Sequence, residues 1–149
     1  MIIRQITKDD IPRLIEIGLM CHQESEYNVM SFSANKCIAL CERIISEPQM
    51  LGMVTLKDNE ITGVLVAAAI PAYFSDEINA SDLLVYVPPE YRGSRAFYLL
   101  CLSYIGWART KGARLIFLRN TTGIEADKVG RLYERMGFSK VGGIYRMEA

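Results

Sequence analysis

Two arginines and a glycine stand where an apolar strand-like run gives way to a turn. The segment Val87-Pro-Pro-Glu-Tyr91 leads into Arg92, Gly93 and Arg95, and an apolar helical pattern follows. The first N–H groups of a helix lack intrahelical partners, and the aligned peptide dipoles place about half a positive charge at that end. Gly93 lets the backbone approach a ligand closely, and the arginines add two cations. The pattern therefore predicts a phosphate-ester site in this turn, although such turns are common in α/β proteins.

The spacing of apolar residues predicts the elements that must position this turn. Strand-like runs cover residues 2–6, 50–57, 60–70, 78–87 and 114–119, and one or two closing strands are expected within 138–147. Helical patterns begin near residue 10 and cover 33–46, 94–111 and 125–136. The run Lys57-Asp-Asn-Glu60 is a hairpin signal between two of the strands.

The order of these elements predicts an α/β (mixed α+β) fold. Three strands should pair antiparallel before a single β-α-β crossover makes the next one parallel. The result is a mixed, mostly antiparallel sheet of six to seven strands, flanked by about four helices on both faces. Ligands of open sheets bind beyond the carboxyl ends of such strands, which is where the Tyr91-Arg-Gly93 turn falls.

Composition restricts the classes of protein. The 149 residues, half of them hydrophobic, suffice for one domain over residues 1–149. Seventeen basic and seventeen acidic residues cancel, so no nucleic-acid partner is expected. The amino terminus lacks a signal-peptide pattern and the apolar run Val64–Ile70 is too short to cross a membrane, so we expect a cytoplasmic protein without a membrane partner. Four cysteines without a C-x-x-C pair and one histidine indicate no metal site.

Two motifs resemble those of the GCN5-related N-acetyltransferases, the GNAT superfamily. The first is Val87-Pro-Pro-Glu-Tyr-Arg-Gly93 with the long helix that ends in Trp107-Ala-Arg-Thr-Lys-Gly-Ala113. The second is Arg131-Leu-Tyr-Glu-Arg-Met-Gly-Phe138, in which a helix presents a tyrosine and ends in Gly-Phe. The resemblance covers the whole chain.

This resemblance implies acetyl-CoA as co-substrate, without a metal. The cofactor would lie where two strands splay apart. Backbone groups of one strand would hold the pantetheine arm, and amides of the turn would hold the pyrophosphate. The cofactor-binding residues implied are Leu84, Val85, Tyr86, Val87, Arg92, Gly93, Ser94, Arg95, Ala96 and Phe97. Arg95 and Phe97 stand where the family has small residues, and Ala126 replaces an asparagine for which Asn120 is the candidate substitute.

The chemistry of amine acetylation points to further residues. An amine with a pKa near ~10.4 must lose a proton before it attacks a thioester. Asp82, on the strand before the turn, is the first candidate base, and Glu77, Glu24 and Glu26 are alternatives. A backbone N–H near Val85 or Tyr86 could stabilise the thioester oxygen. The resemblance makes Tyr133 the proton donor to the departing thiolate.

Acceptor recognition is expected from the connection between the first two helices and from two further aromatic residues, because loops on a rigid scaffold carry specificity. The candidates are His22, Glu24, Ser25, Tyr27 and Phe32, together with Tyr73 and Tyr145. Their acidic members suit a cationic amine, either a small molecule or a peptide.

The leading interpretation is an acetyl-CoA-dependent N-acetyltransferase that works by direct transfer in a ternary complex. One alternative is a catalytically weak or inactive acyl-CoA-binding regulatory protein, and another is an interaction module that binds no CoA. Proteins with this resemblance are commonly homodimers, but no heptad or exposed apolar stripe in the sequence proves one here.

Overall fold

A computed structural model describes all residues, 1–149, and contains one sheet and four helices. The strands are β1 (Ile2–Gln5), β2 (Met50–Lys57), β3 (Glu60–Pro71), β4 (Ile78–Tyr86) and β5 (Ala113–Phe117). The helices are α1 (Ile11–Glu24), α2 (Ala34–Ser46), α3 (Ala96–Thr110) and α4 (Ala126–Arg135), with short 3₁₀ turns at Lys8–Asp10 and Pro89–Tyr91. None of the helices has both the length and the apolar composition needed to span a membrane.

The strands lie in the order in which they occur in the chain, β1-β2-β3-β4-β5. Every neighbouring pair is antiparallel except β4 and β5, which are parallel and joined by α3. This confirms the predicted crossover. The β2–β3 hairpin turns at Asp58 and Asn59, both with positive φ, as a two-residue hairpin turn requires.

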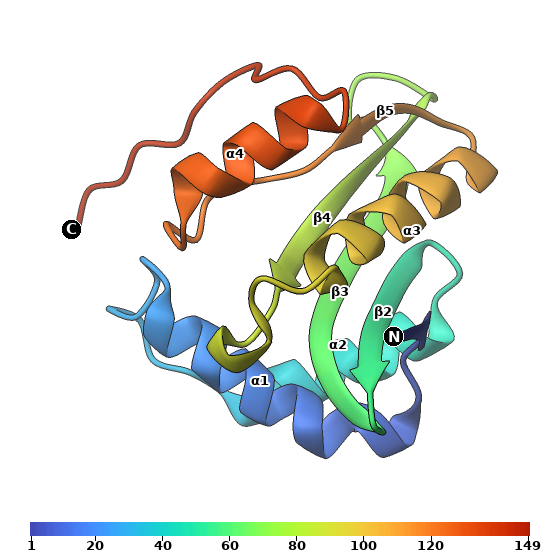
Figure 1. Cartoon of the computed structure of the whole chain (residues 1–149). Helices are drawn as coiled ribbons and strands as arrows, with labels where there is room; N and C mark the ends of the chain where they lie inside the picture. Colours follow the sequence, from blue (N-terminus) through green and yellow to red (C-terminus); the bar gives the residue numbers. More distant parts are fainter.

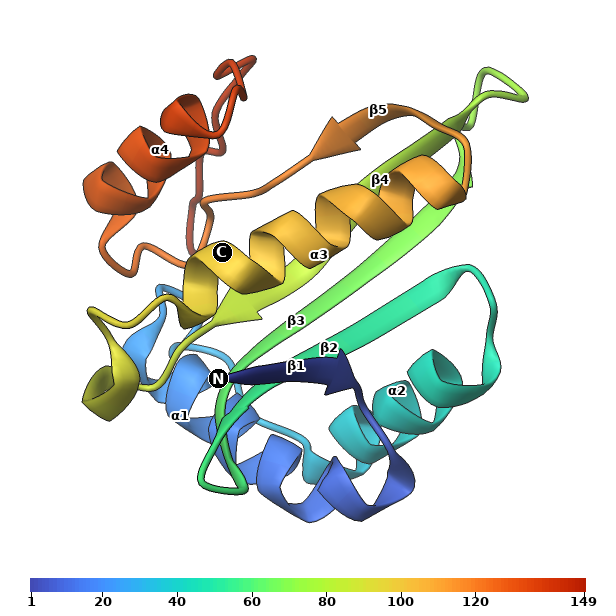
Figure 2. The ribbon, with the colours of Figure 1, turned by 45° about the vertical axis from the view of Figure 1, so that its right-hand side comes forward.

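The sheet separates two apolar layers (Figures 1 and 2). On one face α1 and α2 bury residues such as Ile17 and Ile44 against Val54 and Val64. On the other face α3 packs Leu100 and other apolar residues onto the sheet. Helix α4 lies apart from these layers, beyond the end of β5 (Figure 1). The helices therefore cover both faces, as the sequence predicts.

Local signals explain where the first helices begin. The Asp10 carboxylate accepts from the Thr7 N–H at 2.8 Å and forms an ion pair with Arg4 at 2.7 Å, which fixes the entry into α1. Pro12 lies in the first turn, where its missing N–H costs nothing. The Ser33 hydroxyl accepts from the Lys36 N–H at 3.3 Å and caps α2.

The prediction of six to seven strands is wrong, because the structure has five. Residues 138–149 form no strand, and the outer edge of β5 has no neighbour. The adjacent Gly142 and Gly143 have a high entropic cost of ordering and no side chains to pack. Residues 139–149 are exposed, and the segment runs from the end of α4 back towards α1 (Figure 1), where Arg146 forms an ion pair with Glu26.

Candidate active site

A cavity of about 340 Å³ opens where β4 and β5 diverge. The parallel ladder ends at the pair Ser81 and Phe117, and β4 bulges at Leu83, which has no partner between the pairs Asp82–Ala67 and Leu84–Val66. A bulge bends and twists its strand. The walls are β4 from Asp82 to Tyr86, the turn from Val87 with the start of α3, and residues 119–125 with α4. This is the predicted edge of the sheet, beyond the carboxyl ends of the strands.

The turn before α3 has the backbone of an anion site. Gly93 has a φ of 83°, and a Cβ placed there would meet nothing within 4 Å, so the glycine provides conformation rather than room. The Ser94 hydroxyl accepts from the Ala96 N–H at 3.2 Å. The side chain of Arg95, the residue before α3, does not cap the helix. The next first-turn N–H groups are therefore available to an anionic ligand.

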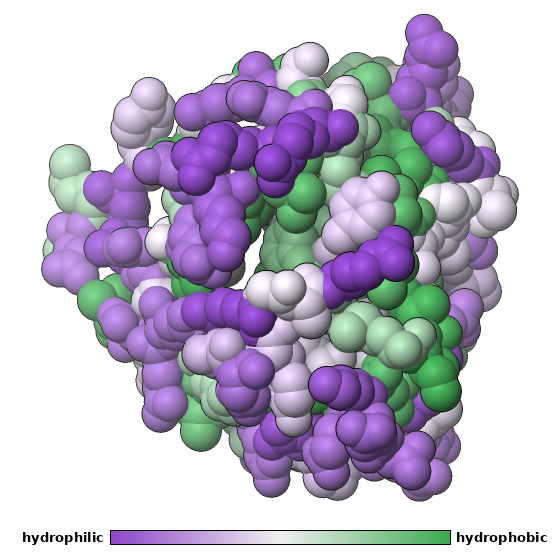
Figure 3. All heavy atoms as spheres, viewed as in Figure 1, coloured by the Kyte–Doolittle hydropathy of each residue, from purple (hydrophilic) through white to green (hydrophobic).

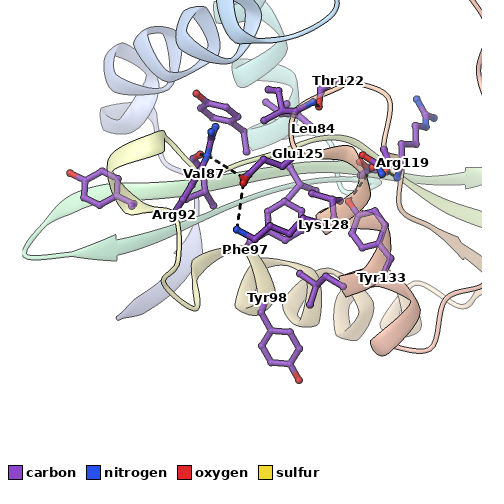
Figure 4. A pocket seen from close by; sticks show the side chains of 18 of the residues that line it. Leu84, Val87, Arg92, Phe97, Tyr98, Arg119, Thr122, Glu125, Lys128 and Tyr133 are labelled. Atoms are coloured by element: carbon purple, nitrogen blue, oxygen red, sulfur yellow. Dashed lines mark hydrogen bonds and ion pairs between the residues drawn. The ribbon is translucent and has the colours of Figure 1, made fainter.

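Basic side chains dominate the rim of the cavity. Arg92, Arg95, Arg119, Lys128 and Arg135 line it, against the carboxylates of Asp82 and Glu125. Figure 3 shows a hollow with an apolar floor and a hydrophilic rim. In Figure 4 the Glu125 carboxylate lies between Arg92 and Lys128, at 3.9 and 3.5 Å. This excess of positive charge suits a ligand with several phosphate charges.

Arg92 is already engaged within the protein. Its guanidinium donates to both oxygens of Glu24, at 2.6 and 2.7 Å, and its Nε donates to the Val87 carbonyl at 3.0 Å. The Tyr86 hydroxyl also donates to Glu24, at 2.8 Å. The hydrogen bonds from Arg92 hold the pKa of Glu24 below its ordinary value, while burial raises the pKa of Tyr86. Glu24 is therefore a poor candidate for a general base.

Asp82 and Tyr133 each form a hydrogen bond with a backbone group of the same residue, Arg119. Asp82 Oδ1 accepts from the Arg119 N–H at 2.8 Å, and the Tyr133 hydroxyl donates to the Arg119 carbonyl at 3.0 Å. Both side chains are buried. Burial raises the pKa of Asp82 to about 6, although the Arg119 N–H opposes that rise. Burial also raises the pKa of Tyr133, so its phenol remains protonated near neutral pH.

Phe97, in the first turn of α3, packs near other aromatic side chains. Its ring lies 6.1 Å from that of Tyr133, measured between centroids, and the ring of Phe138 lies 6.0 Å from that of Tyr133. Phe97 is half-buried and forms part of the cavity wall between α3 and α4. Ala96, by contrast, is fully buried.

The predicted cofactor residues lie together. Those that line the cavity are Leu84, Val85, Tyr86, Val87, Arg92, Gly93, Ser94, Arg95, Phe97 and Asn120. Ala96 is packed beneath them. The Asn120 amide donates to the carbonyl of Ala126, the residue at which α4 begins, so Asn120 fixes the start of that helix.

The predicted acceptor residues do not lie together in the cavity as the predicted cofactor residues do. Glu24 meets the cavity only through Arg92 and Tyr86. His22 packs on Phe32, with 5.5 Å between ring centroids, and the buried Ser25 hydroxyl donates to the His22 carbonyl. These residues and Tyr27 lie around the end of α1, outside the cavity lining.

Two other aromatic candidates lie away from the cavity. Tyr73 is fully exposed in the β3–β4 hairpin, where it packs edge-on against Phe74, so the structure does not bring it to the cavity. Tyr145 is exposed in the segment that follows α4. Glu77, one of the alternative bases, forms an ion pair with Arg114 at 3.8 Å outside the cavity.

Sequence reasoning missed part of the lining. These residues are Leu83, Tyr91, Tyr98, Arg119, Thr121, Thr122, Ile124, Glu125, Lys128, Val129, Leu132 and Arg135. Two signals could have found most of them. Residues 119–125 follow a strand at the carboxyl edge of the sheet, and Lys128, Leu132 and Arg135 recur at helical spacing on one face of α4. No group of three or more histidine, cysteine, aspartate or glutamate side chains is arranged to hold a metal ion.

Comparisons with known proteins agree with this geometry. The sequence model of the Acetyltransferase (GNAT) family matches residues 13–138. No curated protein matches the chain.

Several solved structures share its fold. A transcriptional regulator from Bacillus halodurans C-125 superposes with a TM-score of 0.80 at 20% identity, over 99% of each chain. An acetyltransferase from Trypanosoma brucei gives 0.76 at 17% identity, again over 99% of each chain. AAC(6')-Iy, in complex with the bisubstrate analog CoA-S-monomethyl-acetylneamine, gives 0.78 at 17% identity over 99% of this chain and 98% of that one. At these identities the likeness is one of fold.

Proposed function

Because this chain belongs to the Acetyltransferase (GNAT) family and is therefore an acyltransferase, we propose that it moves an acetyl group from acetyl-CoA to a primary amine. The transfer is direct, within a ternary complex of enzyme, acetyl-CoA and amine. The observation that carries the proposal is the cavity between the diverging strands, with the anion-binding turn at one end and Tyr133 and Asp82 in its wall.

The residues present fit acetyl-CoA. No residue of β4 beyond Ser81 pairs with β5. The main chain of Leu84–Val87 can therefore hydrogen-bond a pantetheine amide, in the way it would bond to a neighbouring strand. The turn at Gly93 and the start of α3 would hold the diphosphate, with Arg95 and Lys128 adding charge. When bound, acetyl-CoA supplies the thioester carbonyl that the amine attacks.

Tyr133 is the proposed proton donor to the leaving thiolate. Its phenol is protonated near neutral pH because burial raises its pKa, and its hydroxyl lies in the cavity wall. Its hydrogen bond to the Arg119 carbonyl orients the hydroxyl and can be exchanged for one to sulfur. A main-chain N–H of Val85 or Tyr86 is the proposed donor to the thioester oxygen.

Asp82 is the proposed base, directly or through water. Its pKa of about 6 leaves it mostly ionised at pH 7 yet more basic than an ordinary aspartate. One of its oxygens binds the Arg119 N–H, which leaves the other for a proton. An amine near the end of α1 would approach the thioester from the side of Glu24 and Glu26.

The acceptor class proposed is a cationic small molecule. Crystal structures of similar fold include aminoglycoside acetyltransferases, one of them in complex with sisomicin, which makes aminoglycosides the first amines to test. Polyamines and peptide amino termini follow, since the acidic residues near the end of α1 suit any cation.

The test is thiol release from acetyl-CoA by the purified chain, with a panel of aminoglycosides, polyamines and peptide amines. We expect saturable turnover with at least one amine. If CoA binds but no amine supports turnover, the proposal of an enzyme would give way to that of an acyl-CoA-binding regulatory protein.

A further inference from the structure

A side chain of β4 bridges to the segment after β5 at the point where the two strands diverge. After the last ladder pair, Ser81–Phe117, the next contact between the two segments is the 2.8 Å hydrogen bond from the Arg119 N–H to Asp82 Oδ1. An N–H of a continuing parallel strand would instead donate to a backbone carbonyl of its neighbour. Here a carboxylate takes the place of that carbonyl.

The other end of Arg119 is held in the same way. Its carbonyl accepts from the Tyr133 hydroxyl at 3.0 Å, so α4 rather than β4 satisfies it. Both backbone groups of Arg119, two residues beyond the last ladder pair, therefore bond to side chains. Asp82 is only 3% exposed, and the next residue, Leu83, is the bulge of β4.

We infer that Asp82 is a positioning residue that holds the two strands apart and so keeps the main chain of Leu84–Val87 free for a ligand. This rests on the proposed function in one respect, because the ligand of that main chain is taken to be the pantetheine arm of an acyl-CoA. The role belongs to the hydrogen-bond acceptor Oδ1 and not to the negative charge.

The energetics support such a role. Adjacent strands joined by backbone hydrogen bonds lie about 4.8 Å apart, too close for a ligand between them. A side chain that bridges the segments keeps them further apart. Without the Asp82 acceptor, the Arg119 N–H would lose its partner and the favourable free energy of a partly buried hydrogen bond. Pairing with a carbonyl of β4 would recover that energy and would extend the ladder into the cavity.

The same residue is the proposed base, and two substitutions separate the roles. Asp82→Asn keeps an oxygen that can accept from Arg119 but removes the basicity. Asp82→Ala removes both. Asp76, exposed in the β3–β4 hairpin and outside the cavity lining, provides the matched control through Asp76→Asn and Asp76→Ala.

The deciding measurement is the Kd of CoA by titration calorimetry, with circular dichroism and thermal unfolding to establish that each variant folds. We expect Asp82→Asn to bind within about threefold of the unsubstituted chain and Asp82→Ala to bind at least about tenfold more weakly, a difference of about 1.4 kcal/mol. The Asp76 variants should be unchanged.

Two results would overturn the inference. One is CoA binding by a folded Asp82→Ala variant that is as tight as that of the unsubstituted chain. The other is equal weakening in Asp82→Asn and Asp82→Ala, which would assign the effect to charge. Because binding is measured without an amine, the outcome does not depend on turnover. A lower kcat in Asp82→Asn at unchanged Kd would support both roles, because this variant loses the basicity and keeps the acceptor.

Discussion

The Arg92 guanidinium donates to both carboxylate oxygens of Glu24, at 2.6 and 2.7 Å, across 68 residues of sequence. Arg92 belongs to the anion-binding turn, and Glu24 is the last residue of α1. Tyr86, at the end of β4, also donates to Glu24. The pair therefore ties the proposed cofactor side of the cavity to the segment where the acceptor is expected, so that movement on one side affects the other.

The first prediction concerns the strength of that tie. A double-mutant cycle with Glu24→Gln and Arg92→Met should give a coupling energy of about 1 kcal/mol or more in urea unfolding, because the pair is bidentate and its arginine is partly buried. The control is the pair Arg43 and Glu47 at the end of α2, whose arginine is 61% exposed against 22% for Arg92, and it should couple more weakly. Equal coupling in the two cycles would argue against a structural role for the tie.

The second prediction concerns the proton donor. Tyr133→Phe should lower kcat about a hundredfold, since the thiolate would leave without a proton. CoA binding should change little, because the hydrogen bond between Asp82 and the Arg119 N–H still holds Arg119 in place. Tyr145→Phe, on an exposed tyrosine, is the control. Steady-state kinetics and calorimetry measure the two effects, and a Tyr133→Phe variant with unchanged kcat would assign Tyr133 to packing alone.

The third prediction concerns Phe97, which stands where the family has a small residue. Its ring packs against Tyr133 and forms the cavity wall, so Phe97→Ala should not tighten CoA binding and should destabilise the fold by about 1–3 kcal/mol. Leu102→Ala is the control, because this exposed residue of α3 lies outside the cavity lining. Tighter CoA binding in Phe97→Ala would mean that the ring obstructs the diphosphate.

The sequence predicted the location of the site better than its contacts. The order of strands and helices requires the carboxyl ends of β4 and β5 to meet at one edge, so the turn at Gly93 and the residues after Phe117 had to lie near each other. Glu24 was assigned to the acceptor because the sequence does not show that α1 ends beside Arg92. The role of Arg119 was hidden because it contributes backbone groups, which are common to all residue types.

Two predictions outside the site show the same limit. Tyr73 was expected near the acceptor, but its position depends on the length and direction of the β3–β4 hairpin, which places it away from the cavity. Closing strands were expected within 138–147 from apolar residues around Gly142 and Gly143. Strand formation depends on cross-strand partners as much as on propensity, and this segment has none.

The fourth prediction concerns close packing beneath β2. A Cβ at Gly52 would lie 2.7 Å from Ile44 Cγ2 and from Ile6 Cδ1, so Gly52→Ala should destabilise the fold by about 1–3 kcal/mol. Gly106, in α3, has nothing within 4 Å of the same position, and Gly106→Ala should stabilise by up to about 1 kcal/mol through helix propensity. Urea unfolding measures both, and equal effects would contradict the packing argument.

The fifth prediction concerns the pH dependence of stability. Burial raises the pKa of Asp82 from 3.8 to about 6, so the folded chain binds a proton there more readily than the unfolded chain does. The resulting stabilisation is full below about pH 4 and is lost as the pH rises through about 6, with an upper bound of about 3 kcal/mol. Asp10 and Glu24, whose pKa values are lowered by arginines, act with the opposite sign at acid pH.

Asp82→Asn isolates the first of these effects, because both proteins keep Asp10 and Glu24. The variant should gain stability relative to the unsubstituted chain as the pH rises from about 4, and most of the gain should fall between about pH 4 and about pH 6, between the pKa values of the unfolded and folded states. Urea unfolding across this range measures the difference. A difference that does not vary with pH would show that the carboxylate titrates alike in both states. The hydrogen bond from Arg119 would then compensate fully for burial, and Asp82 would lose the raised basicity that favours it as a base.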